Sequence, residues 1–311
     1  METKKTTETK KKTNKKLLLI VNPGAGKMKA GSALLELVTE FSAPPPTCES
    51  YEVTVFPTTK RSDAEEKVVK SGADYDLVVC YGGDGTLSEL VNGIARMEVP
   101  PPFSFVPAGT ANDFAATVGM PTNVHQAVKK ILTGKDSPLD IGAFNDRHFV
   151  YVAAFGLFTS VSYTVPQGKK KAFGQLSYVM EGIKQAIDIP SHKMTVEFND
   201  KVVKDEFVVG LVTNSTSVAG MFKLNKSRVK LDDGNFELTL VKNPNNPLLL
   251  SKIIMDLTAQ KYDPDYVIFE RVSYVKFHCN EQIAWCLDGE NGGIHNTAII
   301  NNLHKKGTIR I

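Results

Sequence analysis

The sequence lacks several features that would place the protein in a membrane or outside the cell. No apolar run approaches the ~20 residues that a helix needs to span a bilayer. The lysine-rich N-terminus is not followed by the apolar stretch of a secretory signal, because the run at 17–21 is short and ends in a Pro-Gly turn. The four cysteines include no C-x-x-C pair. These absences predict reduced thiols and a cytoplasmic protein.

Signals for nucleic-acid binding are also missing. The chain has no zinc-ligand spacing, no helix-turn-helix pattern and no segment in which aromatic and basic residues alternate, so we expect no nucleic-acid partner. The composition is that of an ordinary globular protein, with 42% hydrophobic and 23% charged residues. A length of 311 residues is enough for two domains.

The positive charge of the chain is concentrated at its start. Residues 1–16 contain seven lysines and two glutamates, which leaves 30 basic and 32 acidic residues, a net charge of −2, for the remainder. A run of this kind is often a disordered, solubilising tail. It can also attract anionic lipid, at ~1 kcal/mol per lysine near the membrane surface. Both interpretations stay open, and the second predicts peripheral association with the inner face of the membrane.

The first half of the chain alternates short apolar runs with helical patterns. The expected strands are 16–22, 51–56, 76–81 and 102–109. The expected helices are 29–41, 62–73, with Ser62 as N-cap, 86–96 and 124–134. This order predicts an α/β domain with a parallel sheet and helices on both faces.

From about residue 137 the pattern becomes rich in strands separated by Asn, Asp and Gly turns. The expected strand regions are 140–156, with a turn at Asn145-Asp146, and then 193–215, 229–243, 266–279 and 305–311. They predict an antiparallel β-sandwich, interrupted by helical inserts near 170–188 and 247–261. We therefore divide the chain into a basic tail at 1–15, a nucleotide-binding α/β domain at 16–138 and a β-sandwich domain at 139–311.

Three loops in the first half predict a phosphate site. NPGAGK (22–27), GGDGT (82–86) and PAGTAND (107–113) each follow an expected strand and lead into a helix. In open α/β sheets ligands bind at the carboxyl ends of the strands, and the amides at helix N-termini favour anions. Three such loops in one sheet make nucleotide binding the leading hypothesis.

None of these loops is a standard nucleotide motif. A P-loop would need a glycine at Val21 and a hydroxyl residue at Met28. The pattern G-x-G-x-x-G also fails, because Lys29 and Ser88 stand where its last glycine should be. A P-loop NTPase and a dinucleotide enzyme are therefore both disfavoured.

Asp84, in the middle of GGDGT, is a carboxylate where phosphates are expected. A Mg²⁺ ion between the carboxylate and the phosphates would make this arrangement favourable. Thr86 and Glu89 fit the capping box T-x-x-E, which gives them a purely structural alternative role. The pair Asn92-Gly93 has no helix-propensity reason to be in a helix, so we expect close packing there.

The ordered motifs resemble one known family. GGDGTLSELVNG and PAGTANDFA, with NPGAG before them and KLDDG and DGENGG after them, resemble the diacylglycerol kinase catalytic family, and most closely the soluble bacterial lipid kinases. The resemblance extends over about 16–311. It implies a Rossmann-like N-terminal domain joined to a β-sandwich, with the active site in the cleft between them. The implied activity is ATP-dependent transfer of a phosphoryl group to a lipid hydroxyl, with diacylglycerol giving phosphatidic acid.

The resemblance also implies roles for particular residues. The general base would be Glu290 of the DGE sequence, and Asp84 would act with it in catalysis through Mg²⁺. A hydroxyl that the family often has in its first loop is missing at Ala25. The ATP-binding residues would be Asn22, Pro23, Gly24, Ala25, Gly26, Thr58, Gly82, Gly83, Asp84, Gly85, Thr86, Leu87, Ser88 and Thr110.

A second Mg²⁺ site is implied at KLDDGN, with Lys230, Asp233 and Asn235 as its residues, partly through carbonyl groups. The same stretch is also explained without a metal, because Asp, Gly and Asn suit a tight turn. The resemblance further suggests a homodimer. The basic residues 169–171 precede an apolar stripe at helical spacing (173–187), which fits either a membrane-docking lip or a helix buried in the core.

Alternative functions remain at this point. The GGDGT loop is shared with sphingoid-base and NAD kinases, and a nucleotide-binding regulator could keep the same fold without catalysis. Turnover of ATP with a lipid extract, with NAD and with neither would separate these possibilities.

Overall fold

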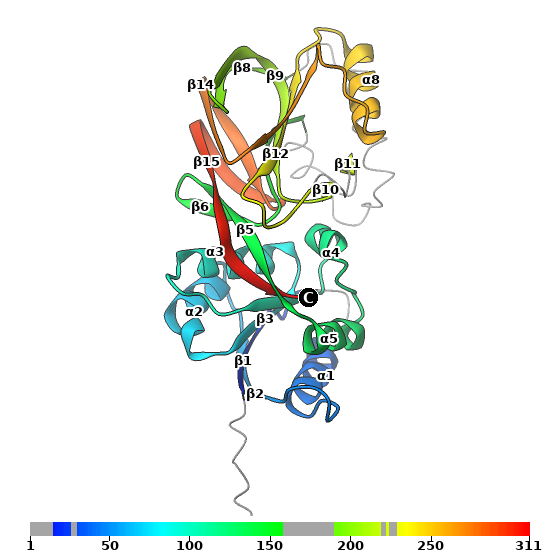
Figure 1. The fold of residues 1–311 in the computed structure, drawn as a ribbon, viewed down its shortest axis with the longest axis vertical. Coiled ribbons are helices and arrows are strands. Elements are labelled where there is room, and N and C mark those ends of the chain that lie inside the picture. The colour runs from blue at the N-terminus through cyan, green and yellow to red at the C-terminus, as the bar shows by residue number, and fades with distance from the viewer. Residues whose placement is uncertain (1–14, 26–29, 158–189, 219–221, 224–228) are drawn as a thin grey trace, which may run out of the picture.

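The computed structural model describes residues 15–25, 30–157, 190–218, 222–223 and 229–311. Figure 1 shows an elongated molecule with an α/β half and a β-rich half. The basic tail, Gly26 and the expected helix at 170–188 lie outside the described residues, apart from Lys15, which begins the first strand. The second expected helical insert is confirmed as α8 (Pro247–Thr258), which begins with Asn246 as its N-cap.

The sheet of the first half is parallel, as predicted. Its strand order is β2-β1-β3-β4, and each neighbouring pair runs in the same direction. The central strands are buried on both faces, which explains why they read as continuous apolar runs. The bounds are β1 (Lys15–Val21), β2 (Tyr51–Pro57), β3 (Leu77–Gly82) and β4 (Phe103–Pro107).

Helices cover both faces of this sheet. Figure 1 shows α2 and α3 on one side of the strands and α1 and α5 on the other. Helix α3 begins at Asp84, two residues earlier than expected, so the last three residues of GGDGT form its first turn. The bounds are α1 (Ala30–Ser42), α2 (Asp63–Ser71), the 3₁₀ turn η1 (Gly72–Asp74), α3 (Asp84–Arg96), α4 (Asp113–Val118) and α5 (Val124–Thr133).

The second half is a large antiparallel sheet that bends around an aromatic core. The first part of strand β9 pairs with β8, and its second part pairs with β7. Strand β14 likewise pairs first with β8 and then, at its end, with β7. The enclosed core includes Phe155, Phe277 and Trp285, which meet in edge contacts. The bounds are β5 (Asp136–Phe144), β6 (Arg147–Phe149), β7 (Val152–Gly156), β8 (His192–Phe198), β9 (Lys201–Thr213), β10 (Ser217–Val218), β11 (Phe222–Lys223), β12 (Phe236–Lys242), β13 (Val267–Val272), β14 (Tyr274–Leu287) and β15 (Glu290–Arg310).

The last strand joins the two halves. We expected a strand at 305–311, but β15 begins at Glu290 and is 21 residues long. It pairs with β14 and β5 and then reaches β4, where Ile309 lies beside Phe103 in a parallel pair. Figure 1 shows β15 crossing from the β-rich half to the α/β half beside β5. Within the described residues, thirteen strands therefore form one continuous sheet.

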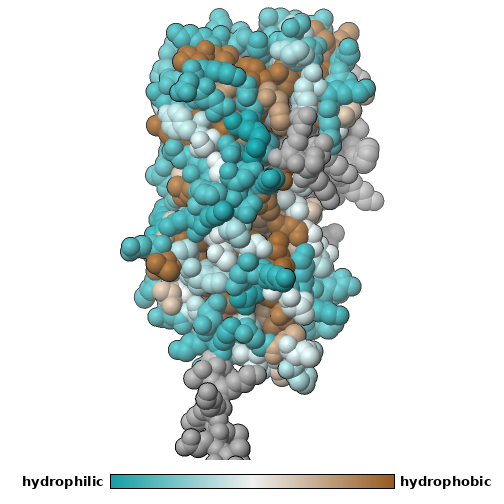
Figure 2. All heavy atoms as spheres, viewed as in Figure 1, coloured by the Kyte–Doolittle hydropathy of each residue, from teal (hydrophilic) through white to brown (hydrophobic). Residues whose placement is uncertain are grey.

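The described part of the chain has no helix with the length and apolarity required to cross a membrane. Figure 2 shows a mostly hydrophilic face on which apolar residues form small, separate patches. This distribution is ordinary for a folded protein, because scattered apolar residues are normal on protein surfaces.

One buried carboxyl group has no hydrogen-bonding role in the fold. Glu237 on β12 is 1% exposed, and neither of its carboxylate oxygens has a hydrogen-bond partner among the described residues. Burial raises its pKa to about 8, although Arg271 on the neighbouring strand acts in the opposite direction. The folded protein therefore favours the protonated carboxyl, whereas the unfolded chain ionises it near pH 4.5.

This difference predicts a pH-dependent loss of stability. The contribution of Glu237 is fully present below about pH 4.5 and is lost as the pH rises through about 8, by as much as ~5 kcal/mol. Glu237→Gln should flatten this slope between pH 5 and 8, as measured by urea unfolding. Glu197→Gln, which breaks an exposed ion pair with Lys276, is the control and should leave the slope unchanged. Equal slopes in wild type and Glu237→Gln would refute the prediction.

Candidate functional site

A large cleft, about 2110 Å³ in volume, lies where the three glycine loops meet the β-rich half. The α/β half lines it with residues that follow β1, β2, β3 and β4, as expected for the carboxyl ends of parallel strands. The β-rich half contributes Arg147, Glu290 and Asn291.

The first loop is tied to the second by one side chain. The Nδ2 group of Asn22 donates to the Thr86 hydroxyl at 3.1 Å, and its Oδ1 accepts the Gly24 amide at 2.9 Å. Gly82 leaves room for this arrangement, because a Cβ there would lie 2.4 Å from the Thr86 oxygen. The start of the first loop, at Asn22–Gly24, is therefore fixed against the first turn of α3.

The glycines of the second and third loops pack against each other. A Cβ on Gly109 would lie 2.7 Å from the Gly83 Cα, and a Cβ on Gly83 would lie 3.1 Å from the Gly109 Cα. We expected these glycines to admit a ligand's phosphates. The contact shows a further reason for them, since any side chain at either position would push the two loops apart. Close packing also explains the glycine at position 93, because a Cβ added there would lie 2.7 Å from the Cβ of Val68 on α2.

The capping-box prediction for Thr86 and Glu89 is wrong. Helix α3 begins after Gly83 without a side-chain cap, which puts Thr86 inside the helix. Glu89 instead accepts the amides of Ser62 and Ala64, at 2.9 and 3.2 Å, and so caps the start of α2. Ser62 is at the N-cap position as predicted, but its side chain makes no cap hydrogen bond. A carboxylate from a neighbouring helix has taken over that role.

Asp84 lies half-buried at the start of α3. Its Oδ2 accepts the Asn112 amide at 2.8 Å, which links the second loop to the third. Burial, and then the negative charge of Asp113, raise the pKa of Asp84 to about 6. The negative charges of Asp84 and Asp113 repel each other. A divalent cation bound between the two carboxylates would remove this repulsion, so the pair suits Mg²⁺.

Glu290 comes to the cleft from the other half of the molecule. A Cβ added to Gly85 would lie only 3.0 Å from Glu290 Oε1. The carboxylate therefore faces the first turn of α3. Its Oε2 accepts a hydrogen bond from Arg61 Nη2 at 2.9 Å. Asp288, two residues earlier, is the other carboxylate of the DGE sequence. It is buried and accepts the amides of Val150, Tyr151 and Val152 at 2.8–3.1 Å, and it does not line the cleft.

Asn92 fixes the two halves against each other beside the cleft. Its side chain accepts the His148 amide at 2.9 Å and donates to the His148 carbonyl at 3.1 Å. This double hydrogen bond gives Asn92 a reason to stand within α3 that helix propensity could not supply.

Most of the predicted ATP-binding residues meet at the cleft. Those that line it are Asn22, Pro23, Gly24, Ala25, Thr58, Gly83, Gly85, Thr86, Ser88 and Thr110. Three others do not line it: Gly82 packs against Thr86, Asp84 accepts the Asn112 amide, and Leu87 belongs to the core. Gly26 lies outside the described residues.

Sequence reasoning missed a group of polar residues in the cleft. Some of them could have been predicted from their position in the sequence. Residues 59–62 follow the carboxyl end of β2, a parallel strand, as the three glycine loops follow β1, β3 and β4. The missed residues are Thr59, Lys60, Arg61, Ser62, Glu65, Glu66, Glu89, Asn92, Arg96, Arg147 and Asn291. Ala108 and Gly109, which also line the cleft, belong to the predicted PAGTAND loop.

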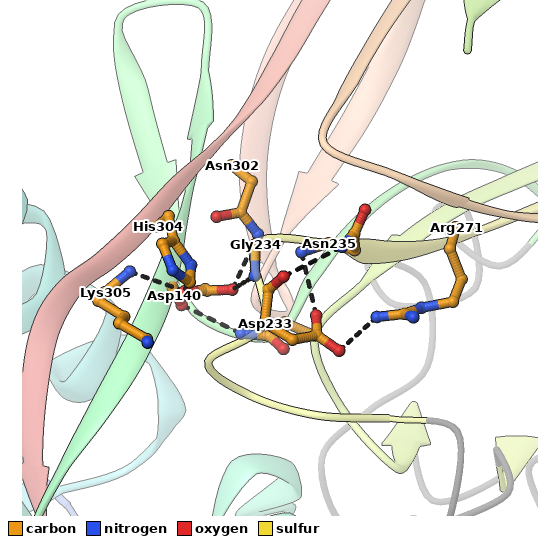
Figure 3. A network of polar contacts seen from close by, with 9 residues as sticks. Asp140, Asp233, Gly234, Asn235, Arg271, Asn302, His304 and Lys305 are labelled. Atoms are coloured by element: carbon orange, nitrogen blue, oxygen red, sulfur yellow. Dashed lines mark hydrogen bonds and ion pairs between the residues drawn. The ribbon is translucent and has the colours of Figure 1, made fainter.

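The KLDDGN stretch lies apart from the cleft and is held by hydrogen bonds (Figure 3). Asp233 Oδ1 accepts the Asn235 amide at 3.1 Å, and Oδ2 pairs with Arg271. The Gly234 amide donates to Asp140, a fully buried carboxylate, at 2.6 Å. Asp140 also accepts from Asn302 and Lys305, and His304 Nδ1 lies 3.0 Å from it.

These contacts do not suit the implied second Mg²⁺ ion. Both carboxylate oxygens of Asp233 already have partners, and one of those partners is a cation. These hydrogen bonds are those expected of a tight turn that forms without a metal ion.

We therefore expect Arg271, and not a metal, to stabilise this turn. Arg271→Ala should lower the free energy of unfolding by ~1 kcal/mol, because the Asp233 carboxylate loses its charged partner. Any rise in melting temperature that Mg²⁺ causes without nucleotide should be the same in the wild type and in Asp233→Ala, as measured by calorimetry. Lys201→Ala, which removes an exposed ion pair with Glu270, is the control. A Mg²⁺-dependent rise that disappears in Asp233→Ala would favour the metal instead.

The chain is similar in sequence to known diacylglycerol kinases. A model of the diacylglycerol kinase catalytic domain matches residues 16–144. A diacylglycerol kinase of Bacillus subtilis (strain 168) is 30% identical over 282 residues, covering 90% of this chain and 91% of its own. One from Staphylococcus carnosus (strain TM300) is 31% identical over 280 residues, with 90% of each chain covered.

Solved structures share the fold. The crystal structure of a diacylglycerol kinase from Bacillus anthracis strain Sterne superposes with a TM-score of 0.74 and 24% identity, covering 96% of this chain and 97% of its own. Another crystal structure from that strain has a TM-score of 0.80 and 26% identity, with coverages of 95% and 96%. The chain is a phosphotransferase that belongs to the diacylglycerol kinase catalytic family.

Proposed function

We propose that this protein is a lipid kinase that transfers the γ-phosphate of ATP to the hydroxyl of diacylglycerol, giving phosphatidic acid. The reaction would take place in the cleft between a Rossmann-like α/β domain and the β-rich domain. Diacylglycerol kinases from Bacillus and Staphylococcus are similar to this chain over most of their length. This similarity supports diacylglycerol as the substrate. The main observation behind the proposal is that the Glu290 carboxylate lies against Gly85. This contact places a candidate base beside the expected phosphate loop.

Each part of the cleft has a role in this reaction. The loops at Asn22–Ala25, Gly83–Ser88 and Thr110 would bind the phosphates of ATP, with backbone amides at the start of α3 favouring the anion. Glu290 would take the proton of the lipid hydroxyl as it attacks the γ-phosphorus. Positioning and charge neutralisation supply most of the catalysis in phosphoryl transfer.

Asp84, with Asp113 beside it, would hold Mg²⁺. When bound, the ion would offset the phosphate charge and the repulsion between the two carboxyl groups. The lipid would be reached by peripheral association with an anionic membrane surface, and a homodimer remains a prediction from family resemblance.

The test is a direct search for the acceptor. The purified protein is incubated with ATP, Mg²⁺ and a total lipid extract, and the new phosphate esters are identified by mass spectrometry. We expect phosphatidic acid to dominate. Parallel incubations contain NAD or a sphingoid base as the acceptor. Phosphorylation of either in preference to diacylglycerol, or ATP consumption with no lipid product, would overturn the proposal.

A further inference from the structure

The β2–α2 loop brings an arginine to the candidate base. Arg61 lies in this loop, and its Nη2 is 2.9 Å from Glu290 Oε2, although 229 residues separate the two in sequence. Both residues line the cleft. We propose that Arg61 alternates between two anions, pairing with Glu290 before nucleotide binds and with the terminal phosphate of ATP afterwards. This inference rests on the proposed function.

Arg61 has the donors and the freedom that this exchange requires. A guanidinium carries five N–H donors in a planar fork that matches phosphate oxygens. Within the described part of the chain, Arg61 makes one hydrogen bond, the one to Glu290. Its side chain is 78% exposed and that of Glu290 is 43% exposed. An ion pair this exposed is weak, so a polyphosphate can displace it.

Three other basic residues line the cleft, and each already has a partner. Arg147 donates from its Nη1 to the Asn291 carbonyl. Lys60 lies 4.0 Å from Asp63 and 3.8 Å from Glu66, and Arg96 pairs with Glu65 at 2.9 Å. Their carboxylate partners all belong to α2. Arg61 differs because its carboxylate partner is the candidate base itself.

The exchange would couple the base to the nucleotide. While Arg61 pairs with Glu290, the guanidinium occupies the carboxylate oxygen Oε2, so this oxygen is not free to contact the lipid hydroxyl. When the guanidinium moves to the γ-phosphate, it neutralises charge there and leaves Glu290 available. Arg61 is therefore assigned as a positioning residue for Glu290 and as a binding residue for ATP.

The first test compares nucleotides that differ by one phosphate. Titration calorimetry measures ATP and ADP binding, each with Mg²⁺, to wild type, Arg61→Ala, Arg61→Lys and Lys70→Ala. Lys70, exposed on α2 outside the cleft, controls for the loss of one positive charge. We expect Arg61→Ala to weaken ATP binding roughly 10- to 100-fold, ADP binding to change little, and Arg61→Lys to recover part of the loss. Equal losses for ATP and ADP, or no loss for ATP, would overturn the assignment.

The second test asks whether the two anions compete. Glu290→Gln removes the charge that holds Arg61, so it should strengthen ATP binding about two- to fivefold, and this gain should vanish when Arg61→Ala is also present. An unchanged ATP affinity in Glu290→Gln would refute the exchange. These readouts need no turnover, and circular dichroism confirms that each variant is folded. If the wild type binds no ATP, the proposed function fails first, and that outcome is distinct from a failure of the Arg61 assignment.

Discussion

Asp84→Asn should abolish phosphoryl transfer and yet make the protein more stable. Activity is lost because the neutral amide is a poor ligand for Mg²⁺ beside the phosphates of ATP. Stability rises because burial and Asp113 already disfavour the ionised carboxyl, whose pKa is raised to about 6. Above that pH the folded protein carries an unfavourable charge that the amide removes, worth up to ~3 kcal/mol. The Asn112 amide can still donate to the new side-chain oxygen.

The measurement pairs an activity assay with urea unfolding at pH 8 and at pH 5. The stability gain should be present at pH 8 and should shrink at pH 5, where the Asp84 carboxyl is mostly protonated in the folded state. Asp76→Asn, near the opposite end of β3, serves as the control for loss of one carboxylate. Near-normal turnover of Asp84→Asn would remove this residue from the catalytic site.

Glu290→Gln should lower kcat ~10²- to 10⁴-fold without weakening ATP binding, because a general base contributes a factor of this size to the chemical step. The substitution keeps the shape of the side chain, which faces the first turn of α3. Single-turnover kinetics with ATP and dispersed diacylglycerol measure the loss directly. Glu281→Gln, at an exposed position on β14, is the matched control.

A loss of ATP affinity without a loss of kcat would assign Glu290 to the nucleotide site instead. Asp288 is not a natural replacement in that case. Its carboxylate is fully buried behind three backbone amides, which makes it a structural group that fixes the turn before β15. Asp288→Asn should therefore affect folding more than catalysis.

Local patterns were sufficient to predict much of this protein. Apolar runs located the strands of the parallel sheet, and the glycine loops that follow them do meet at one cleft. This succeeded because the alternation of strand and helix fixes which strand ends share an edge. The helix at 247–258 was also predictable, since its apolar periodicity and its Asn246 cap are local signals.

What the sequence could not reveal depends on contacts between distant segments. Glu89 caps a neighbouring helix rather than its own, and nothing in T-x-x-E distinguishes these outcomes. The packing of Gly83 on Gly109 and the approach of Arg61 to Glu290 arise only when separate loops come together. The KLDDGN stretch reads as a turn with or without metal, and its partner Arg271 is 38 residues away from Asp233.

The path of β15 has a consequence for how the chain folds. The Ser104 hydroxyl on β4 donates to the Arg310 carbonyl, a contact that spans 206 residues, so β4 completes its pairing with a strand from the far end of the described chain. Pairing across such separations carries a large loop-closure entropy and slows folding. The two halves should therefore unfold in one cooperative transition, and a fragment that contains only residues 16–138 should have an unpaired, aggregation-prone edge at β4.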